Sequence, residues 1–498
     1  MDSRLPVLVV VALAGVVVLA GCSGVTDTPA SSPNASGDEL GVENGYAYDD
    51  SIQIEADDGL NETELERVVS RMMARVEHVR DLEFERSVPV AMIARDEYRD
   101  RAGNRGPGQS RPWDEQFWEA AFVVGEETTV GEARGGVFGA TVQGFYNGSH
   151  IVIVTDDPNS TLPDRGTLVH ELQHALQDQH DLLSGRGDTH DGDLAASGIV
   201  EGDANVVEQE YEERCAGEWS CIPEPEATGG DGPSINLGLF VSVFVPYSDG
   251  PTLVDDLRAR DGWSAVNEAL RSPPESTEQV IHPEKYPEET PVPVRVTDRS
   301  AESWERFGTG DGHRWDVVGE ATLYAAFWHN GVIERGHLQS DSSSLSPYEY
   351  DHPITEGWGG DRIVPYTNGS AEGYVFATTW DTERDARQFH EGYLELLRGQ
   401  DAELVRPGVY RVPESSPYGD AFRVVRNGTR VTVVNAPTVA ALEGVHASTG
   451  EGVTNVTDES TDSTDSPPIP VPGFGVGVTL VALVAAVGLL VRRARLRR

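Results

Sequence analysis

The segment Thr167-Leu168-Val169-His170-Glu171-Leu172-Gln173-His174-Ala175-Leu176 decides how this sequence is interpreted. Its two histidines are four residues apart, so both imidazoles project from one face of a helix and can bind one zinc ion. Glu171 stands beside the first histidine, where a carboxylate can take a proton from a zinc-bound water. The apolar residues around them predict a largely buried helix over residues 166–179.

A zinc site of this kind needs a third protein ligand and one open position for water. His180 follows His174 at the spacing of the metzincin pattern. That pattern also requires a glycine where this sequence has Gln177, and a later methionine turn, whereas all four methionines precede the motif. We therefore expect His180 to lie behind the ligands, in their second shell, or at the surface.

The alternative third ligand is Glu201, on a predicted helix over residues 195–214. A glutamate on a second helix completes a two-histidine, one-carboxylate site of the gluzincin type. Asp203 and Asn205 are placed to orient an imidazole from outside the ligand shell, although gluzincins carry an aspartate where this sequence has Asn205. The predicted zinc ligands are His170, His174 and Glu201.

Several segments of the sequence carry a resemblance to a known family: His170–His180, Val200–Ala204, Pro246–Gly250, Ser276–Tyr286, Gly357–Arg362 and Trp380–Glu383. They resemble a family of exported metallopeptidases from bacteria and haloarchaea, over most of residues 61–400. The resemblance implies an α+β fold with a zincin-like core and a mixed α/β C-terminal part. A zincin-like core binds zinc as its cofactor. The resemblance does not name a substrate, and we expect an extracellular protein or peptide because the chain is exported.

Two further side chains are candidates for the reaction itself. Tyr247 and His282 each offer a hydrogen-bond donor that can stabilise a negatively charged oxygen in a transition state. Tyr286, in the same segment as His282, is an alternative donor. His282 stands in a proline-flanked turn beside Lys285, which is the only lysine in the sequence. The alternative is that this turn only docks a loop onto the fold.

The N-terminal residues predict export and lipid attachment. Arg4, an apolar run over residues 5–19 and the sequence Leu19-Ala20-Gly21-Cys22 resemble a lipoprotein signal. In that interpretation residues 1–21 are removed and lipid is added to Cys22. The alternative is an ordinary signal peptide followed by an incidental cysteine.

The C-terminal residues predict a membrane anchor over residues 471–498. Pro472-Gly473-Phe474 opens an apolar stretch that ends at Val491 and is followed by arginines. The stretch is near the minimum length of a transmembrane helix, and the basic tail places the rest of the chain outside the cell. This arrangement resembles the signal that an archaeosortase processes on archaeal surface proteins. A permanent C-terminal helix is the alternative and predicts the same topology.

The composition limits the partners of the chain. Its formal net charge is -45, and halophiles use such an acid excess to keep proteins soluble by self-repulsion. Nucleic-acid binding is not expected, because it needs a basic surface. Asn-x-Ser/Thr sequons fit an exposed glycoprotein. Cys215 and Cys221 predict a short disulfide loop in an oxidising compartment, and zinc binding by the pair is the weaker alternative.

Changes of composition divide the chain into a signal (1–21), a flexible tether (22–60), a zincin-like domain (61–290), a mixed α/β part (291–445), a stalk rich in Thr, Ser and Asp (446–470) and the anchor (471–498). We predict a helix capped by Asn61 and another over residues 383–397. Strands are predicted over residues 88–94, 140–146, 150–155 and 374–380, with a hairpin turn at Asn147-Gly148 and a loop over 181–193.

The sequence therefore predicts a cell-surface zinc metallopeptidase that hydrolyses extracellular peptide bonds with a metal-activated water. A non-catalytic surface or binding protein that retains the zincin-like fold is the alternative, and a purely structural metal site is a third. The presence of Glu171, which a decayed enzyme could lose, favours catalysis.

Overall fold

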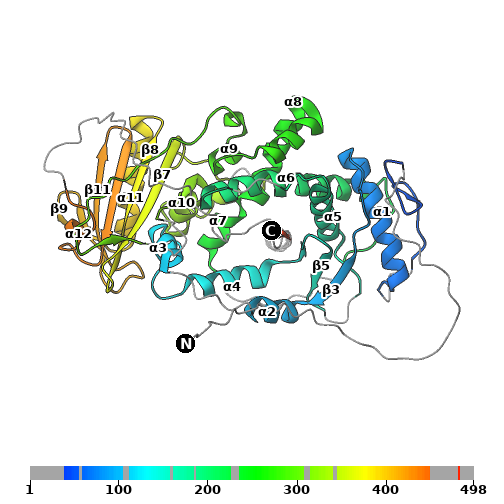
Figure 1. Ribbon diagram of the computed structural model, residues 1–498, viewed down its shortest axis with the longest axis horizontal. Helices are drawn as coiled ribbons and strands as arrows, with labels where there is room; N and C mark the ends of the chain where they lie inside the picture. The colour runs from blue at the N-terminus through cyan, green and yellow to red at the C-terminus, as the bar shows by residue number, and fades with distance from the viewer. Residues whose placement is uncertain are drawn as a thin grey trace, which may run out of the picture. The chain divides into compact units, whose positions relative to one another are not determined.

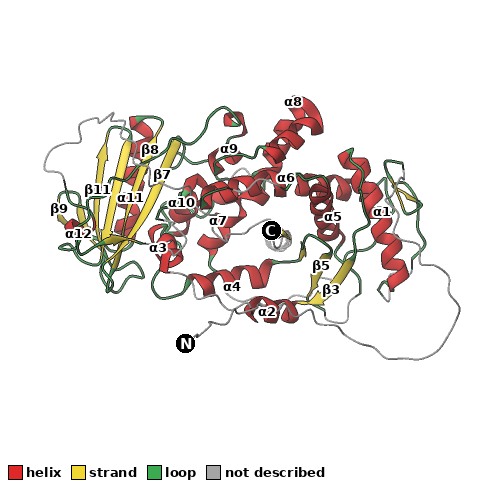
Figure 2. Ribbon diagram, viewed as in Figure 1, coloured by secondary structure: helices red, strands yellow, loops and turns green. Residues whose placement is uncertain are grey.

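The computed structural model describes the residues 39–54, 59–104, 112–157, 161–183, 187–225, 235–307, 314–339 and 345–448, and the backbone of Leu480–Ala482 (Figure 1). The predicted signal peptide, Cys22 and most of the tether and stalk lie outside these residues. The described elements mix helices and strands, which confirms the α+β prediction at that level (Figure 2).

Helix α1 (Glu62–Arg80) begins where the sequence predicts it. The Asn61 side chain accepts the backbone N–H of Glu64, and the Glu64 side chain accepts the N–H of Asn61. This capping box pairs backbone donors that the first turn of a helix leaves free. The buried face of α1, with Val68 and Met72, belongs to the same apolar cluster as Leu168 and Leu172 of the histidine motif.

A small sheet lies beside these helices. Strand β3 (Val90–Ala94) pairs in parallel with β5 (Ile151–Thr155), and β5 pairs antiparallel with β4 (Gly144–Tyr146) through the predicted hairpin. Gly148 in that turn has a φ of +87°, which only glycine adopts without strain. Strand β4 is shorter than predicted because residues 140 and 141 belong to α4 (Val130–Thr141). The other elements of this part are β1 (Val42–Glu43), β2 (Tyr46–Ala47), α2 (Arg95–Asn104) and α3 (Pro112–Ala120).

The C-terminal apolar stretch departs from the prediction where the structure describes it. Leu480–Ala482 form strand β13 rather than a helix, and β13 pairs antiparallel with β4. The sheet order is therefore β13-β4-β5-β3. An edge strand leaves backbone donors and acceptors unpaired on one side, so an apolar segment can hydrogen-bond to it. The rest of residues 471–498 lies outside the described residues.

The central helices carry the histidine motif and its surroundings. Helix α5 (Arg165–Gln179) is capped by Asp164, and α6 (His190–Cys215) is capped by Thr189. Because Thr189 accepts the N–H of Gly192, α6 begins inside the segment predicted as a loop over 181–193. The following elements are α7 (Leu237–Ser248), α8 (Gly250–Arg271), α9 (Thr277–Ile281), η2 (Pro283–Lys285), α10 (Gly319–His329) and η3 (His337–Gln339).

The run Leu237–Arg271, formed by α7 and α8, is long and apolar enough to cross a membrane by composition alone. However, 83% of its most apolar window is buried inside the protein. This burial is typical of a core helix in a folded domain.

The C-terminal part is built on an antiparallel seven-stranded sheet with the order β6-β7-β8-β12-β11-β10-β9. The predicted strand and helix are both present, as β8 (Glu372–Trp380) and α11 (Glu383–Gly399). Helix α11 packs on one face, with Phe389 stacked on Trp380 at 4.7 Å between ring centroids. The remaining elements are β6 (Glu305–Arg306), β7 (Trp358–Thr367), β9 (Glu403–Arg406), β10 (Val409–Arg411), β11 (Ala421–Asn427), β12 (Arg430–Ala436) and α12 (Leu442–Val445).

One apolar cluster includes residues from both sides of position 290. It contains Phe117 and Phe240 from the first part and Phe327, Phe376 and Phe389 from the second. The domain boundary near residue 290 stays a prediction, but these side chains share a core.

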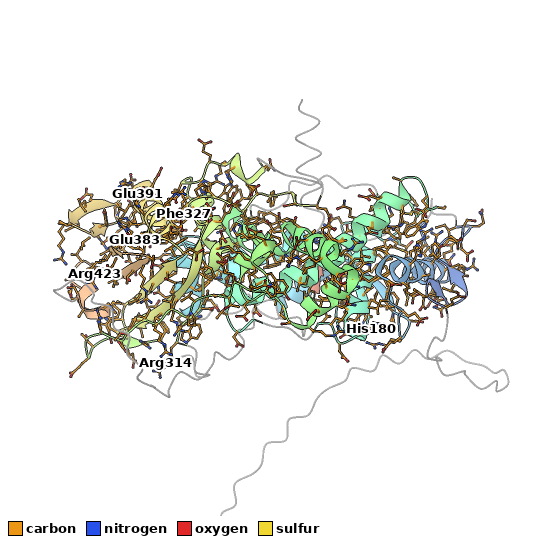
Figure 3. All side chains as sticks on the ribbon, turned by 90° about the horizontal axis from the view of Figure 1, so that it is seen from above. His180, Arg314, Phe327, Glu383, Glu391 and Arg423 are labelled. Atoms are coloured by element: carbon orange, nitrogen blue, oxygen red, sulfur yellow. A yellow bond between two sulfur atoms is a disulfide. The ribbon has the colours of Figure 1, made fainter. Side chains whose placement is uncertain are left out.

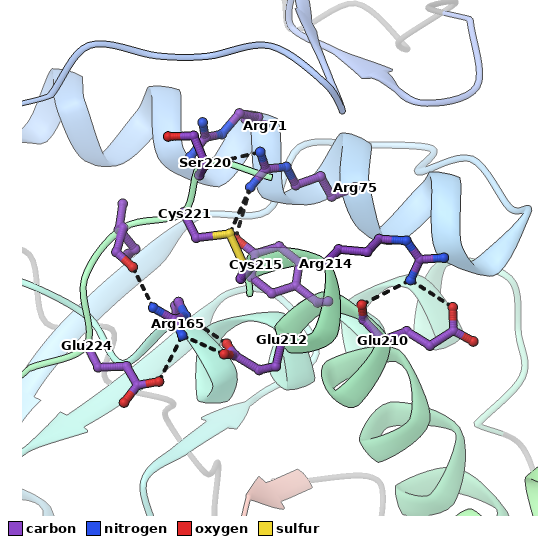
Figure 4. The surroundings of a disulfide bond; sticks show 12 residues. Arg71, Arg75, Arg165, Glu210, Glu212, Arg214, Cys215, Ser220, Cys221 and Glu224 are labelled. Carbon is purple, nitrogen blue, oxygen red and sulfur yellow. Dashed lines mark hydrogen bonds and ion pairs between the residues drawn. A yellow bond between two sulfur atoms is a disulfide. The ribbon is translucent and has the colours of Figure 1, made fainter. Parts of the chain in front are cut away.

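Cys215, at the end of α6, forms a disulfide with Cys221 (Figure 4). Arg75 of α1 donates to the carbonyl of Ser220 and contacts Cys221 Sγ. Arg165 at the start of α5 is held by Glu212 and Glu224 (Figure 4). The disulfide loop at the end of α6 thus contacts α1 through Arg75 and the start of α5 through Arg165.

Candidate metal centre

Three side chains from α5 and α6 meet at one point. His170 Nε2 lies 3.1 Å from Glu201 Oε2 and 3.1 Å from His174 Nε2, and His174 Nε2 lies 3.3 Å from Glu201 Oε2. Both histidines are fully buried, and Glu201 is 4% exposed. The structure therefore brings together the three residues that the sequence predicts as zinc ligands.

The spacing of these three atoms fits tetrahedral zinc. Zinc bonds of about 2.0–2.1 Å to nitrogen and oxygen, at tetrahedral angles, separate neighbouring ligand atoms by about 3.3–3.4 Å. The observed separations are 3.1, 3.1 and 3.3 Å. Two imidazole nitrogens and one carboxylate oxygen are donors that zinc favours, and a fourth position is left for water.

Glu171 is buried beside these three side chains. Its exposed fraction is 0%, and within the described part of the chain neither carboxylate oxygen has a partner. The backbone of Tyr146 in β4 is near enough to affect the pKa of Glu171, but it makes no well-formed hydrogen bond. Leaving a buried polar group unpaired costs about 1–3 kcal/mol. A carboxylate in this position can find its hydrogen-bond partner in a bound molecule instead of a protein atom.

The Nδ1 atom of each imidazole also has a polar partner. His170 Nδ1 lies 3.3 Å from Glu208 Oε2, and His174 Nδ1 lies 2.8 Å from Gln177 Oε1. Such contacts determine which ring nitrogen carries the proton and how the ring is oriented. The Gln177 amide in turn donates to Asp203 Oδ2 at 2.8 Å, so Asp203 acts on His174 through Gln177.

Asp203 is the centre of a buried network. It pairs with Arg80 of α1 at 2.8 Å, and both side chains have no exposed surface. It also accepts the side-chain amide of Gln173 at 2.7 Å. Because charge-assisted hydrogen bonds in a buried network are stronger than neutral ones, this network fixes α1, α5 and α6 around the site.

Neither His180 nor Asn205 hydrogen-bonds an imidazole of the cluster among the described residues, and the position of His180 agrees with its surface alternative. The half-buried ring of His180, labelled in Figure 3, hydrogen-bonds the carbonyl of Glu83 at 2.7 Å instead of a ligand. The buried Nδ2 of Asn205 has no hydrogen-bond partner among the described residues. The carboxylate that meets His170 is Glu208, two helical turns after Glu201. The seven-residue spacing, which returns to the same helix face, is the signal that could have identified it.

The site residues change one another's protonation. Burial acts to lower the pKa of His170, but hydrogen bonds to Glu201 and Glu208 outweigh it and raise the pKa to about 10. Burial acts to raise the pKa of Glu201, but His174 and His170 lower it to about 2. Burial also raises the pKa of Glu171 to about 7. The ligand set therefore holds a proton that a zinc ion would displace on binding.

The two predicted transition-state donors have different positions. Tyr247 of α7 lies at the ligands: it hydrogen-bonds Glu201, and its ring centroid is 6.4 Å from that of His170. Burial raises the pKa of Tyr247 well above its usual value, so its hydroxyl remains a donor. His282 instead pairs with Glu320 at 3.3 Å, and no contact joins it to the ligands among the described residues.

A second carboxylate group, formed by Glu278, Glu289 and Asp381, has a resident cation. The ammonium of Lys285 pairs with all three, at 3.0 Å from Glu289 and 3.5 Å from Asp381. The turn that contains His282 is therefore docked by Lys285, which favours the structural alternative for this segment.

Comparison with known proteins identifies two segments of the chain. Residues 305–446 match a family model described as "Domain of unknown function (DUF8575)". Residues 471–494 match the PGF-CTERM motif, which is a C-terminal signal of archaeal cell-surface, membrane-anchored proteins. The chain is a membrane-anchored cell-surface protein. This confirms the predicted location and the archaeosortase-type signal. No curated protein and no solved structure matches the chain.

Proposed function

We propose that this surface protein is a zinc-dependent metallopeptidase that hydrolyses extracellular peptide bonds. The supporting observation is the buried cluster of His170, His174 and Glu201 at zinc-ligand spacing, with the unpartnered carboxylate of Glu171 beside it. A structural zinc site is closed by four protein ligands, whereas three ligands leave one position for a water. Among the described residues only three side chains converge here, and Glu171 stands beside them as a base for that water.

Each side chain has a role in this proposal. A bound zinc ion would lower the pKa of a water and polarise the substrate carbonyl. Glu171 takes the proton of that water and passes it to the leaving amine. Tyr247 donates its hydroxyl proton in a hydrogen bond to the negatively charged oxygen of the tetrahedral intermediate. Glu208 and Gln177 hold the imidazoles in the required orientation.

The edge of β4 is where an extended peptide substrate would bind. Tyr146 on this strand is the backbone neighbour of Glu171, so a peptide added to the sheet would pass the general base. This edge is paired with Leu480–Ala482 in the structure. Those residues belong to the PGF-CTERM segment, so a substrate would take the place of β13.

The burial of the ligands favours the second candidate, a non-catalytic binding protein. His170, Glu171 and His174 have no exposed surface, whereas a scissile bond must reach the metal. A catalytic role therefore requires the β4 edge to open.

One experiment distinguishes the metallopeptidase from the non-catalytic binding protein. Full-length protein purified in molar salt is assayed for bound zinc and for cleavage of a denatured protein substrate, as wild type and as Glu171→Gln. We expect both proteins to bind one zinc and only the wild type to cleave. Glu213→Gln, at the exposed end of α6, removes one carboxylate outside the site and serves as the control. Zinc binding without any Glu171-dependent cleavage would support the binding protein and overturn the proposal.

A further inference from the structure

The Asn-x-Ser/Thr sequons in the described part of the chain are those of Asn61, Asn147, Asn368 and Asn427. All share the same short pattern, so the pattern does not rank them as acceptors of an N-linked glycan. A transferase joins the sugar to the side-chain nitrogen, Nδ2, and a bulky glycan needs a surface position. The exposure and the contacts of each asparagine therefore distinguish the sequons.

Two of these sequons form a matched pair. Asn147–Ser149 and Asn368–Ser370 are identical Asn-Gly-Ser tripeptides, one in the turn between β4 and β5 and the other in the turn between β7 and β8. In each turn the asparagine Oδ1 accepts the backbone N–H of the serine and, at 2.9 Å, its hydroxyl. The central glycines have φ values of +87° and +83°. The two sequons thus share one local conformation, an Asx-type turn.

The matched sequons differ at the atom that would carry the sugar. Asn147 is half-buried, and its Nδ2 lies 3.1 Å from Nδ1 and 3.0 Å from Nε2 of His150. Asn368 is exposed, and its Nδ2 makes no hydrogen bond to any residue that the structure describes. Both N–H groups of the Asn368 amide therefore face solvent, whereas the ring of His150 covers the amide of Asn147.

The other two sequons are held by secondary structure. Asn61 Nδ2 donates to Glu64 Oε2 at 2.7 Å, and Asn61 Oδ1 caps helix α1. Disturbing such a cap costs about 1 kcal/mol. Asn427 ends strand β11 and is paired with Arg430 in the ladder, so a transferase would have to draw it out of the sheet. Asn368 instead lies beyond the last residue of β7.

We propose that Asn368 is the N-glycosylated residue among these sequons. The donor is an oligosaccharide joined through its C1 atom to a lipid phosphate. Nδ2 of Asn368 forms a bond to C1, the bond between C1 and the phosphate oxygen breaks with its electron pair on that oxygen, and Nδ2 loses one proton. Oδ1 keeps its contacts with Ser370, so the turn persists after the reaction. The proposal does not depend on the metal centre.

Mass spectrometry of the full-length wild-type protein tests this without any substitution. The protein is produced in an archaeal host that makes N-glycans and is digested with trypsin. Cleavage after Arg362 and Arg384 gives the peptide 363–384, in which Asn368 is the single sequon. We expect most copies of this peptide to gain the mass of a glycan. The peptide 135–165 contains both Asn147 and Asn159, so fragmentation that leaves the sugar attached is used there and should show Asn147 unmodified.

Variants check the assignment. Asn368→Gln should remove the glycan mass from peptide 363–384, Ser370→Thr, which keeps the sequon, should retain it, and Asn147→Gln should leave the glycan mass of the whole protein unchanged. Peptide 363–384 without sugar, from cells whose own surface glycoprotein is glycosylated in the same preparation, would overturn the proposal. Equal occupancy of Asn147 and Asn368 would also overturn it, because the exposed Nδ2 would then confer no preference.

Discussion

The Nδ1 atom of His170 lies 3.3 Å from Glu208 Oε2, while its Nε2 atom lies 3.1 Å from Glu201 Oε2. One imidazole thus joins two glutamates that are seven residues apart on α6. In the proposed zinc site Glu201 is a ligand, and Glu208 holds the ring so that Nε2 is directed at the metal.

Replacing the outer glutamate should weaken zinc binding without abolishing it. For Glu208→Gln we expect zinc affinity to fall about 10–100-fold, as is typical for a lost partner of a ligating histidine. Competition with a chromophoric zinc chelator measures this. Glu213→Gln, five residues further along α6, should leave the affinity unchanged, and an equal loss in both variants would contradict the assigned role.

Removing the hydroxyl of Tyr247 should affect the reaction more than the metal. For Tyr247→Phe we expect kcat to fall by about 100-fold or more, because one donor to the transition-state oxygen is lost. Zinc content should stay at the wild-type value. Tyr350→Phe is the matched control, since its hydroxyl donates to the Val241 carbonyl of the same helix but lies outside the ligand set. A fall in zinc content with unchanged kcat would instead make Tyr247 a positioning residue for Glu201.

Gly202, the glycine next to Glu201, allows two helices to cross closely. A Cβ on Gly202 would lie 2.3 Å from the backbone oxygen of Gly250 at the start of α8. Backbone atoms cannot move aside as a flexible side chain can, so Gly202→Ala should lower the free energy of unfolding by about 1–3 kcal/mol. Gly135→Ala, exposed on α4 with no atom within 4 Å of its Cβ, should raise it by about 0.4–1 kcal/mol. Denaturant unfolding in constant salt compares the two, and similar changes in both would refute the close-packing argument.

The stability of the protein should fall as pH rises through the neutral range. Burial raises the pKa of Asp191 to about 8 from its usual 3.8, so the folded state retains a proton that the unfolded chain releases. This contribution is complete below about pH 4 and is lost as pH approaches 8. Asp191→Asn mimics the protonated form and should be more stable than wild type at pH 8 but not at pH 4.

Thermal unfolding at fixed salt concentration across pH 4–8 checks this prediction. Asp96→Asn is the control, because that carboxylate is 94% exposed and should leave the slope of stability against pH unchanged. A slope for Asp191→Asn equal to that of wild type would show that Asp191 is ionised in the folded protein.

Local patterns predicted much of the fold. The capping box at Asn61, the Asn147-Gly148 hairpin and helix α5 each depend on residues within a few positions of one another. The helix α6 begins before the predicted position because its cap, Thr189, stands within a polar, glycine-containing segment whose composition is typical of a loop. The length of β4 was overestimated because Ala140 and Thr141 fit a strand pattern but end a helix.

Local patterns did not predict which side chains surround the proposed zinc ligands. His180 is close to His174 in sequence, but at the end of α5 its ring is directed to the Glu83 carbonyl. His282 lies in a segment that matches the family resemblance, yet it pairs with Glu320 of α10. In both cases the partner is far away in the chain.

What the sequence by itself determined was the helix with His170, Glu171 and His174 on it, and the C-terminal signal of a surface protein. Both are local, because helix periodicity and a membrane-anchor motif each depend on neighbours along the chain. Only the tertiary structure decided which carboxylates meet the imidazoles. The packing of α6 across α5 brings Glu201 and Glu208 to opposite sides of one ring, and that packing depends on the apolar faces of helices distant in sequence.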